Sequence, residues 1–417
     1  IYIVSWLFAL AVSFVSCDDW LDKTPKDRLY PDVYFKTEDE LRLFTNQFYN
    51  NLVPSAVDIY SESSDLIVKS DLMLEMSGQR IIPDEGNGWN FTALRDINFY
   101  LQYSHNCTEV NARNRYDGVA RFFRAYFYFE KVKRYGDIPW YDKALDSDDP
   151  ELYKARDSRE FVMQKMLEDL DFAIANLPKT KNAYVLTRWT ALALKSRVCL
   201  FEGTFRKYHG LEDCEKYLNA CVSASETFMN ESGYTLYKSG STPYRDLFAS
   251  INLQADEVIF GRDYEASLSV LHNVQNYENS TTMGRPGMNK KIVNSYLMAD
   301  GSRFTDKAGY ETMTFDQECQ NRDPRLAQTI RTPGYTRIGS TKKEAPNLAY
   351  TMTGYHLIKY SMTANYDEYN KSCNDIPLFR TAEVYLNFAE AKAELGTLKQ
   401  ADINKSIKLL RDRVGMT

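Results

Sequence analysis

A helix that is apolar on almost every side constrains this chain more than any other feature of its sequence. Residues 119–135 read VARFFRAYFYFEKVKRY, which places large apolar or aromatic side chains on nearly all faces of a helix. Such a helix is stable only when other elements surround it. Gly136 and Pro139 follow, a glycine suited to the position after a helix and a proline that stops it. The spacing predicts a buried central helix over 117–135.

Further helices are predicted before and after this segment. Thr37 opens the sequence Thr-Glu-Asp-Glu, which is typical of a capping box at a helix start. Asp157 and Glu160 are expected to cap a later helix, and Thr187 is expected to begin the one after it. Apolar residues at helical spacing predict these helices over about 37–52, 157–177, 187–205, 211–228, 381–395 and 401–414.

Short connections between these helices favour antiparallel neighbours. The helix pairs recur at uneven separations, so the pattern is that of degenerate tetratricopeptide repeats without a clean period of 34 residues. We therefore predict an all-α fold, a tetratricopeptide-like scaffold over about 37–228 and 378–417. Residues 229–377 are rich in Gly, Ser, Thr, Asn and Pro, with only short β-like runs at 257–260 and 356–360. A loop-rich insertion of this length suggests a binding region.

The N-terminal segment is typical of an exported lipoprotein. Residues 1–16 form one uncharged apolar run, which is shorter than a membrane-spanning helix and suited to a signal peptide. The run ends at Ser16, and Cys17 and two acidic residues follow, so Cys17 is predicted to carry a lipid. The alternatives are the start of a membrane helix or an ordinary core cysteine. Because no Met or basic segment precedes Ile1, we expect the sequence to begin inside a longer reading frame.

Composition and motifs argue against several function classes. The chain has 51 Lys and Arg against 57 Asp and Glu, a net charge of −6, which disfavours nucleic acid as a partner. Its four histidines are far apart, and no nucleophile, phosphate-loop, dinucleotide or zinc-protease motif is present. We therefore predict no catalytic residues, no metal and no cofactor. Asp146, Asp148 and Asp149 lack calcium-loop spacing and are interpreted as a solvated acidic turn. The six cysteines after Cys17 are interpreted mostly as small buried residues.

Trp89 is the strongest candidate for a ligand contact. It lies with Asn90 in a polar, glycine-flanked loop, Asp-Glu-Gly-Asn-Gly-Trp-Asn, where nothing in the local pattern buries it. An aromatic ring stacks on the apolar face of a sugar, whose hydroxyl groups pair with Asn, Asp and Arg. The alternative is a hydrophobic lid over the following helix, which carries Leu94, Ile97 and Leu101.

A second candidate group lies in the insertion. It consists of Tyr264, then Asn276 and Tyr277, then Arg285 in the sequence Met-Gly-Arg-Pro-Gly. The Arg and Asn side chains are suited to sugar hydroxyls, and Tyr277 is suited to stacking. An ordinary solvated loop is the alternative for each of them.

Several segments together resemble the SusD/RagB family of outer-membrane nutrient-binding lipoproteins. The resemblance runs from Cys17 to Thr417 and rests on these pieces: Cys-Asp-Asp-Trp-Leu-Asp at 17–22, Ala-Arg-Phe-Phe-Arg-Ala-Tyr at 120–126, Arg-Tyr-Gly-Asp-Ile-Pro at 134–139, Arg-Trp-Thr-Ala-Leu-Ala at 188–193, Asp-Gly-Ser-Arg at 300–303, Arg-Asp-Pro-Arg-Leu at 322–326, and Pro-Leu-Phe-Arg-Thr-Ala-Glu-Val at 377–384. The family normally continues beyond the segment that 411–416 resembles, so we expect a missing C-terminal portion. Thr381 stands where an aromatic or branched residue is expected, which concerns packing.

The resemblance implies a single domain over 17–417 that is anchored through Cys17 and faces the cell exterior. It further implies capture of an oligosaccharide or polysaccharide and its delivery to a SusC-like TonB-dependent transporter, with no bond made or broken. The family's pocket draws an aromatic residue from the loop before the helix that Trp89 precedes, which favours Trp89 as a ligand contact. The alternatives are a peptide- or glycopeptide-binding surface lipoprotein and a tetratricopeptide-type protein-interaction scaffold.

Overall fold

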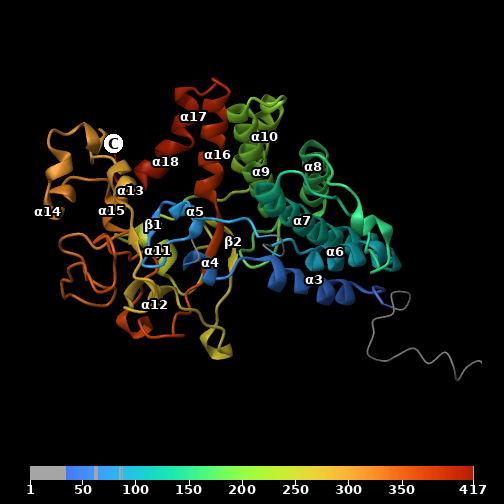
Figure 1. Cartoon of the computed structure of the whole chain (residues 1–417), viewed down its shortest axis with the longest axis horizontal. Coiled ribbons are helices and arrows are strands. Elements are labelled where there is room, and N and C mark those ends of the chain that lie inside the picture. The colour runs from blue at the N-terminus through green and yellow to red at the C-terminus, as the bar shows by residue number, and fades with distance from the viewer. Residues whose placement is uncertain (1–33, 61–63, 84–85, 87, 417) are drawn as a thin grey trace, which may run out of the picture.

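The structure is a computed structural model that describes residues 34–60, 64–83, 86 and 88–416. The predicted signal peptide over 1–16 and the predicted lipidation site at Cys17 lie outside these residues. Figure 1 shows the long helices of the N-terminal half on one side of the molecule and the insertion, in yellow and orange, on the other. In the described ranges, no helix has the length and apolar character that crossing a bilayer requires.

The predicted helical scaffold is present. Its longer helices are α3 (Glu38–Leu52), α6 (Thr92–Tyr103), α7 (Val110–Tyr135), α8 (Arg159–Asn176), α9 (Arg188–His209), α10 (Cys214–Glu231) and α16 (Thr381–Glu394). Sequential helices from α7 to α10 pack against one another, and α16 packs on α9 and α10. The first and last helical blocks of the chain therefore form one array.

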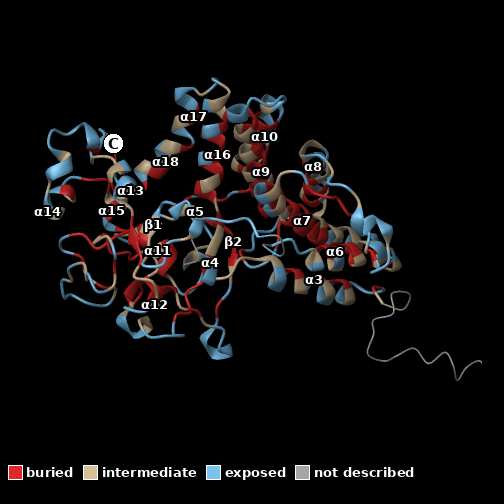
Figure 2. Cartoon of the chain, viewed as in Figure 1, coloured by how far each residue is buried: buried red, intermediate tan, exposed pale blue. Residues whose placement is uncertain are grey.

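Helix α7 is the buried centre of that array. Figure 2 shows it largely buried, and Phe122, Phe123, Tyr128 and Val132 are at most 2% exposed. It ends at Gly136, whose backbone has a φ of 70° and whose N–H donates to the carbonyl of Val132. The helix begins at Val110, seven residues before the predicted start. The predicted start was too late because the first two turns carry mostly polar side chains, which give no apolar periodicity.

Two predicted helix caps are confirmed and one is wrong. Thr37 and Thr187 both form capping boxes, at the starts of α3 and α9. At α8 the cap is Ser158, whose side chain accepts a hydrogen bond from the N–H of Phe161. The carboxylate of Asp157 is engaged elsewhere, since it accepts a hydrogen bond from the N–H of Trp140 at 2.7 Å. A tertiary contact thus removes Asp157 from the local capping role.

The predicted helix over 401–414 is broken into two. The structure has α17 (Gln400–Asn404) and α18 (Ile407–Asp412). Ser406 between them leaves helical geometry, with φ −136° and ψ −94°, and its buried hydroxyl donates to the carbonyl of Asp402 at 2.5 Å. Ser side chains that bond to the backbone in this way compete with the helix ladder.

The insertion is irregular, as predicted, and holds short elements around small apolar clusters. Strand β2 (Val258–Arg262) pairs antiparallel with β4 (Ile376–Arg380), which runs directly into α16 and so ties the insertion to the array. Strand β1 (Ile67–Val68) pairs with β3 (Gly287–Met288).

The described residues also form short α-helices and 3₁₀ turns along the whole chain. The short α-helices are α4 (Val57–Tyr60), α5 (Leu74–Ser77), α11 (Pro243–Ala249), α12 (Val274–Asn279), α13 (Lys290–Ser295), α14 (Phe315–Glu318) and α15 (Pro324–Ala327). The 3₁₀ turns are η2 (Ser104–Asn106), η3 (Pro150–Tyr153), η4 (Ala266–Leu268), η5 (Phe304–Asp306), η6 (Tyr310–Thr312) and η7 (Ala364–Tyr366).

The run over 356–360 is not a strand. His356 and Leu357 form only isolated bridges, to Gly287 and Ile330 respectively. His356, Leu357 and Ile358 are buried within the insertion without belonging to a sheet. The six cysteines after Cys17 are free, four of them buried and two, Cys214 and Cys319, intermediate.

Candidate functional site

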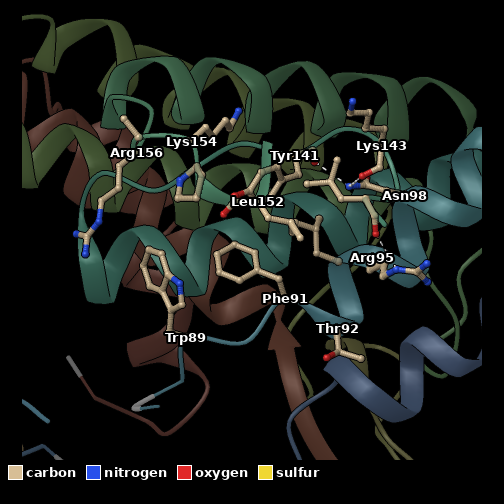
Figure 3. A pocket seen from close by; sticks show the side chains of 14 residues that line it. Trp89, Phe91, Thr92, Arg95, Asn98, Tyr141, Lys143, Leu152, Lys154 and Arg156 are labelled. Atoms are coloured by element: carbon tan, nitrogen blue, oxygen red, sulfur yellow. Dashed lines mark hydrogen bonds between the residues drawn. The ribbon is translucent and has the colours of Figure 1, made fainter. Parts of the chain in front are cut away.

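A pocket of about 520 Å³ opens beside Trp89. Three segments form it: the loop that precedes α6, the first half of α6, and residues 139–156, which connect α7 to α8 (Figure 3). Its lining is aromatic and apolar with a basic rim, and consists of Trp89, Phe91, Thr92, Leu94, Arg95, Asn98, Pro139, Tyr141, Lys143, Leu145, Leu152, Lys154, Ala155 and Arg156. The pocket therefore joins the predicted Trp89 loop to a segment about fifty residues further along the chain.

Trp89 is partly packed and partly open to solvent. Its ring meets those of Phe91 and Tyr135 edge to face, with centroids 5.3 and 4.9 Å apart. Trp89 as a residue nevertheless remains 39% exposed, although its side chain is large and apolar. The guanidinium carbon of Arg156 lies 4.9 Å from the ring centroid, a cation–π distance. Trp89 thus covers part of the helix pair beneath it and also presents surface to the pocket.

The loop that carries Trp89 is held against α7. Gly88 has a φ of 83°, and a Cβ atom there would lie 3.3 Å from the hydroxyl of Tyr135, so the close approach favours glycine. Lys131 donates a hydrogen bond from Nζ to the carbonyl of Gly88. Burial lowers the pKa of Lys131, and the neighbouring charge of Arg134 lowers it further. The N–H of Trp89 donates to the carbonyl of Gly86 at 2.9 Å. These contacts fix where the indole ring points.

Asn90 forms a hydrogen bond at the start of α6. Its side-chain oxygen accepts a hydrogen bond from the N–H of Thr92 at 2.8 Å, which satisfies a donor of the first helical turn. Asn90 is exposed but does not line the pocket. Its predicted contact with a ligand stays a prediction.

The wall opposite the loop is built from residues 139–156. Tyr141 is buried, and its hydroxyl donates to the carbonyl of Leu152 at 3.3 Å, which folds the segment back on itself. Asn98 of α6 is 1% exposed and donates from Nδ2 to the carbonyls of Tyr141 and Lys143, at 2.8 and 3.3 Å. Lys154 donates from Nζ to the carbonyl of Trp140 at 2.6 Å. Buried hydrogen bonds therefore attach this wall to α6.

Basic side chains of the rim pair with acidic residues outside the lining. Arg95 approaches Asp146 at 3.7 Å, Lys154 approaches Asp157 at 3.0 Å, and Lys143 lies between Asp149 at 3.4 Å and Glu151 at 3.0 Å. The hydrogen bond to Glu151 raises the pKa of Lys143. Two members of the predicted acidic turn, Asp146 and Asp149, thus act as counterions for pocket cations. Among the described residues, no group of three or more His, Cys, Asp or Glu side chains is placed to hold a metal ion.

The second predicted group lies elsewhere, around α12 and the segments next to it. Tyr264 is buried and its hydroxyl accepts a hydrogen bond from the N–H of Ala56 at 2.7 Å, and burial raises its pKa. Asn276 donates from Nδ2 to the carbonyl of Asp367 at 2.7 Å, and Tyr277 is 3% exposed. Arg285 donates to the carbonyl of Leu348 at 2.6 Å. None of the four lines the pocket beside Trp89, and their contacts with a ligand stay predictions.

Sequence patterns did not identify most of the pocket. No local pattern marks five of the lining residues as site residues, because each has an ordinary sequence context. They are Phe91, Asn98, Tyr141, Lys154 and Arg156. Two signals were available: the aromatic pair Phe91 and Tyr141, and the three basic residues at 143, 154 and 156. Neither signal indicates a site until the chain brings residues 139–156 against the Trp89 loop.

Two family models match the chain. One, described as "SusD family", matches residues 247–417, and another, described as "Starch-binding associating with outer membrane", matches residues 78–188. The second range contains every residue that lines the pocket. "SusD-like protein P2" of Formosa agariphila is 25% identical over 415 residues, which covers 93% of this chain and 76% of that protein. "SusD-like protein P38" of the same organism is 24% identical over 205 residues, 45% of this chain and 39% of that protein.

Solved structures share the fold. A SusD-like protein of Bacteroides fragilis superposes with a TM-score of 0.74 at 22% identity and covers 95% of this chain and 82% of its own. A SusD-like carbohydrate binding protein of the same species gives 0.73 at 18% identity, with 92% and 79% covered. A structure with xylogluco-oligosaccharide gives 0.63 at 18% identity, with 90% and 76% covered. The predicted all-α, tetratricopeptide-like fold with an irregular insertion is confirmed.

Proposed function

Because the chain belongs to the SusD/RagB family, whose members bind carbohydrate and are not enzymes, we propose that it captures an oligosaccharide in the pocket beside Trp89. The observation that carries the proposal is Trp89, a 39% exposed residue whose indole ring lines a pocket together with Phe91 and Tyr141. Sugar rings present apolar C–H faces, and these stack on aromatic side chains.

The polar groups around the aromatic residues suit sugar hydroxyls. Arg95, Lys143, Lys154 and Arg156 supply N–H donors at the rim, and the hydroxyl of Thr92 is both donor and acceptor (Figure 3). A pocket of this kind, mostly apolar with a few polar groups, can bind a ligand and fix its orientation. Support also comes from relatives, since one solved structure of this fold is described as carbohydrate binding and another holds a xylogluco-oligosaccharide.

Delivery and anchoring complete the proposal. The family description "Starch-binding associating with outer membrane" supports association with that membrane. We infer that a lipid on Cys17 provides the anchor, that residues 1–16 are a signal peptide, and that residues 17–417 form one domain facing the cell exterior. The captured oligosaccharide then passes to a TonB-dependent transporter.

Calorimetric titration of a panel of oligosaccharides against the wild-type chain and Trp89→Ala tests the capture step. Loss of one stacked aromatic is expected to weaken binding about tenfold or more, a change typical of removing one large contact. Tyr153→Ala is the matched control, since Tyr153 is 86% exposed in the same 139–156 segment but does not line the pocket. If Trp89→Ala and wild type have equal affinity for every bound sugar, the binding site lies elsewhere. If the wild-type chain binds peptides in the same titration but no sugar, the carbohydrate assignment is rejected.

Membrane fractionation of Cys17→Ala tests the anchor. Because a single acyl chain gives only marginal membrane affinity, the multiply acylated cysteine is expected to hold the protein, and the variant is expected in the soluble fraction. Fractionation wholly with outer membranes, in cells that lack the partner transporter, would show that Cys17 is not the anchor. Co-purification of the wild-type chain with the transporter tests delivery.

A further inference from the structure

We propose that this pocket selects anionic oligosaccharides, which carry uronate or sulfate groups, and that Arg156 is the residue that pairs with the anion. The inference rests on the proposed carbohydrate capture and adds the ligand's chemical class. Its first observation is a contrast of charge: the chain as a whole carries a net charge of −6, whereas the described residues that line the pocket include four cations and no carboxylate.

Three of the four cations already have partners. Arg95, Lys143 and Lys154 each lie within 4 Å of a carboxylate that belongs to the outer side of the 139–156 segment or its end. Their charges are therefore partly compensated by the protein. Arg156 differs, because no carboxylate of the described residues lies within ion-pair distance of it. It is exposed, so no buried network requires its charge.

Arg156 stands where a bound sugar would carry its substituents. Its guanidinium lies 4.9 Å from the centroid of the Trp89 ring, the same ring that we assign to stacking. Figure 3 shows the guanidinium beside the indole, on the side away from Phe91, so an anionic substituent of a sugar at the Trp89 end of the pocket would meet it. The planar fork of Arg donates two parallel hydrogen bonds to a carboxylate or sulfate, which a neutral hydroxyl does not match.

One further cation lies behind the Trp89 loop and adds to the positive potential. Lys131 donates a hydrogen bond to the carbonyl of Gly88. Charges within about 10 Å of one another act together at moderate ionic strength. An anion at the mouth of the pocket is therefore attracted from both sides of the indole, and an aromatic surface with this potential favours an acidic sugar over a neutral one.

The test compares three probes of equal length: an oligogalacturonate, a sulfated carrageenan oligosaccharide and a neutral maltooligosaccharide. Each is titrated calorimetrically into the wild-type chain, Arg156→Gln and Arg156→Lys, at about 20 mM and about 200 mM NaCl. We expect an anionic probe to bind at least about tenfold more tightly than the neutral one at low salt and to lose much of that advantage at high salt. The stronger of the two anionic probes identifies uronate or sulfate as the source of the charge.

The Arg156 variants locate the effect. Arg156→Gln is expected to lower affinity for the anionic probe about tenfold and to change affinity for the neutral probe less than about threefold, whereas Arg156→Lys retains part of the anionic preference. Arg42→Gln is the matched control, since Arg42 is an exposed arginine of α3 away from the pocket. Thermal melts of all variants check that the fold is intact.

The outcomes separate this inference from the function on which it rests. If the neutral probe binds as tightly as the anionic ones and Trp89→Ala weakens it, carbohydrate capture stands and the anionic preference is overturned. If Arg156→Gln and Arg42→Gln weaken the anionic probe equally, the general charge of the protein is responsible and the role of Arg156 is overturned. If no probe of either class binds, the proposed function fails together with the inference.

Discussion

The guanidinium of Arg124 in α7 donates two hydrogen bonds to the carboxylate of Asp169 in α8, with distances of 2.7 Å from Nε to Oδ2 and 2.8 Å from Nη2 to Oδ1. Both side chains are buried. A third N–H of Arg124 donates to Oδ1 of Asn98 at 3.2 Å, and Asn98 in turn donates to the carbonyl of Tyr141. The ion pair in the helical array is thereby connected to the wall of the candidate pocket.

Asp169→Asn is expected to destabilise the protein by about 3–5 kcal/mol, because it leaves the buried guanidinium of Arg124 without its counterion. Urea denaturation measures the change. Asp171→Asn is the control on the same helix, since Asp171 pairs with Lys195 but is 60% exposed, and exposed pairs contribute at most about 1 kcal/mol. Equal losses for the two variants would contradict the structural role of the buried pair.

Asn98→Leu is expected to weaken sugar binding although the Asn98 side chain is buried beneath the pocket. The substitution keeps the approximate size but removes the donor to the carbonyls of Tyr141 and Lys143, and a buried group left without its partner costs about 1–3 kcal/mol. Titration and chemical denaturation measure the two effects. Gln102→Leu, at an exposed position of the same helix, is expected to change neither. Unaltered binding by Asn98→Leu would show that the wall keeps its position without this contact.

Gly203→Ala is expected to destabilise the packing of α9 on α10. A Cβ atom on Gly203 would lie 2.7 Å from Cγ of Leu218, so the two helices must separate, at a cost of about 1–3 kcal/mol that exceeds the gain in helix propensity. In a Leu218→Ala background the contact with Cγ is gone, although the backbone N of residue 218 would still lie 3.1 Å from the new Cβ atom, so the same substitution is expected to destabilise less. Denaturation of the four chains measures the difference, and equal destabilisation in both backgrounds would reject a clash with the Leu218 side chain.

Glu278→Gln is expected to change how stability depends on pH. Burial raises the pKa of Glu278 from 4.5 to about 7, and its carboxylate accepts hydrogen bonds from Ser361 and from the N–H of Tyr360. Between these two pH values the native chain holds a proton that the unfolded chain has lost, so the contribution of Glu278 to stability falls as pH rises. Gln cannot ionise, and it keeps one acceptor oxygen for the N–H of Tyr360 while its NH2 group can donate to the hydroxyl of Ser361. Glu278→Gln is therefore expected to gain stability relative to wild type from about pH 5 to about pH 8.

The difference between the two chains isolates Glu278 from other buried groups. Burial lowers the pKa of His272 to about 4 and that of His356 to about 3, which gives the opposite slope, since their neutral forms are lost as pH falls. Both histidines are present in both chains, so their contribution cancels in the difference. A constant difference across the pH range, measured by denaturant titration at each pH, would show that Glu278 has no raised pKa.

The sequence by itself determined the helical array. A helix over 119–135 with apolar residues on nearly all faces is stable only when other helices bury it. The capping boxes at Thr37 and Thr187 are local hydrogen-bond patterns that depend on residues three apart. Where a tertiary contact competes with a local one, the prediction was wrong: Asp157 leaves its cap to bond with Trp140, and Ser406 interrupts a helix whose apolar pattern continues through it.

Only the tertiary structure decided the composition of the candidate site. Trp89 stood out in the sequence because an indole in a polar, glycine-flanked loop is unexpected, which is a local property. Arg156, Tyr141 and Asn98 carry no such local signal, and they reach Trp89 because α7 returns the chain past α6 and buried hydrogen bonds hold residues 139–156 there. Likewise, Tyr264 and Tyr277 are in a polar stretch of sequence but are buried by segments far along the chain. Exposure and charge pairing are properties of contacts, and contacts between distant segments follow from packing.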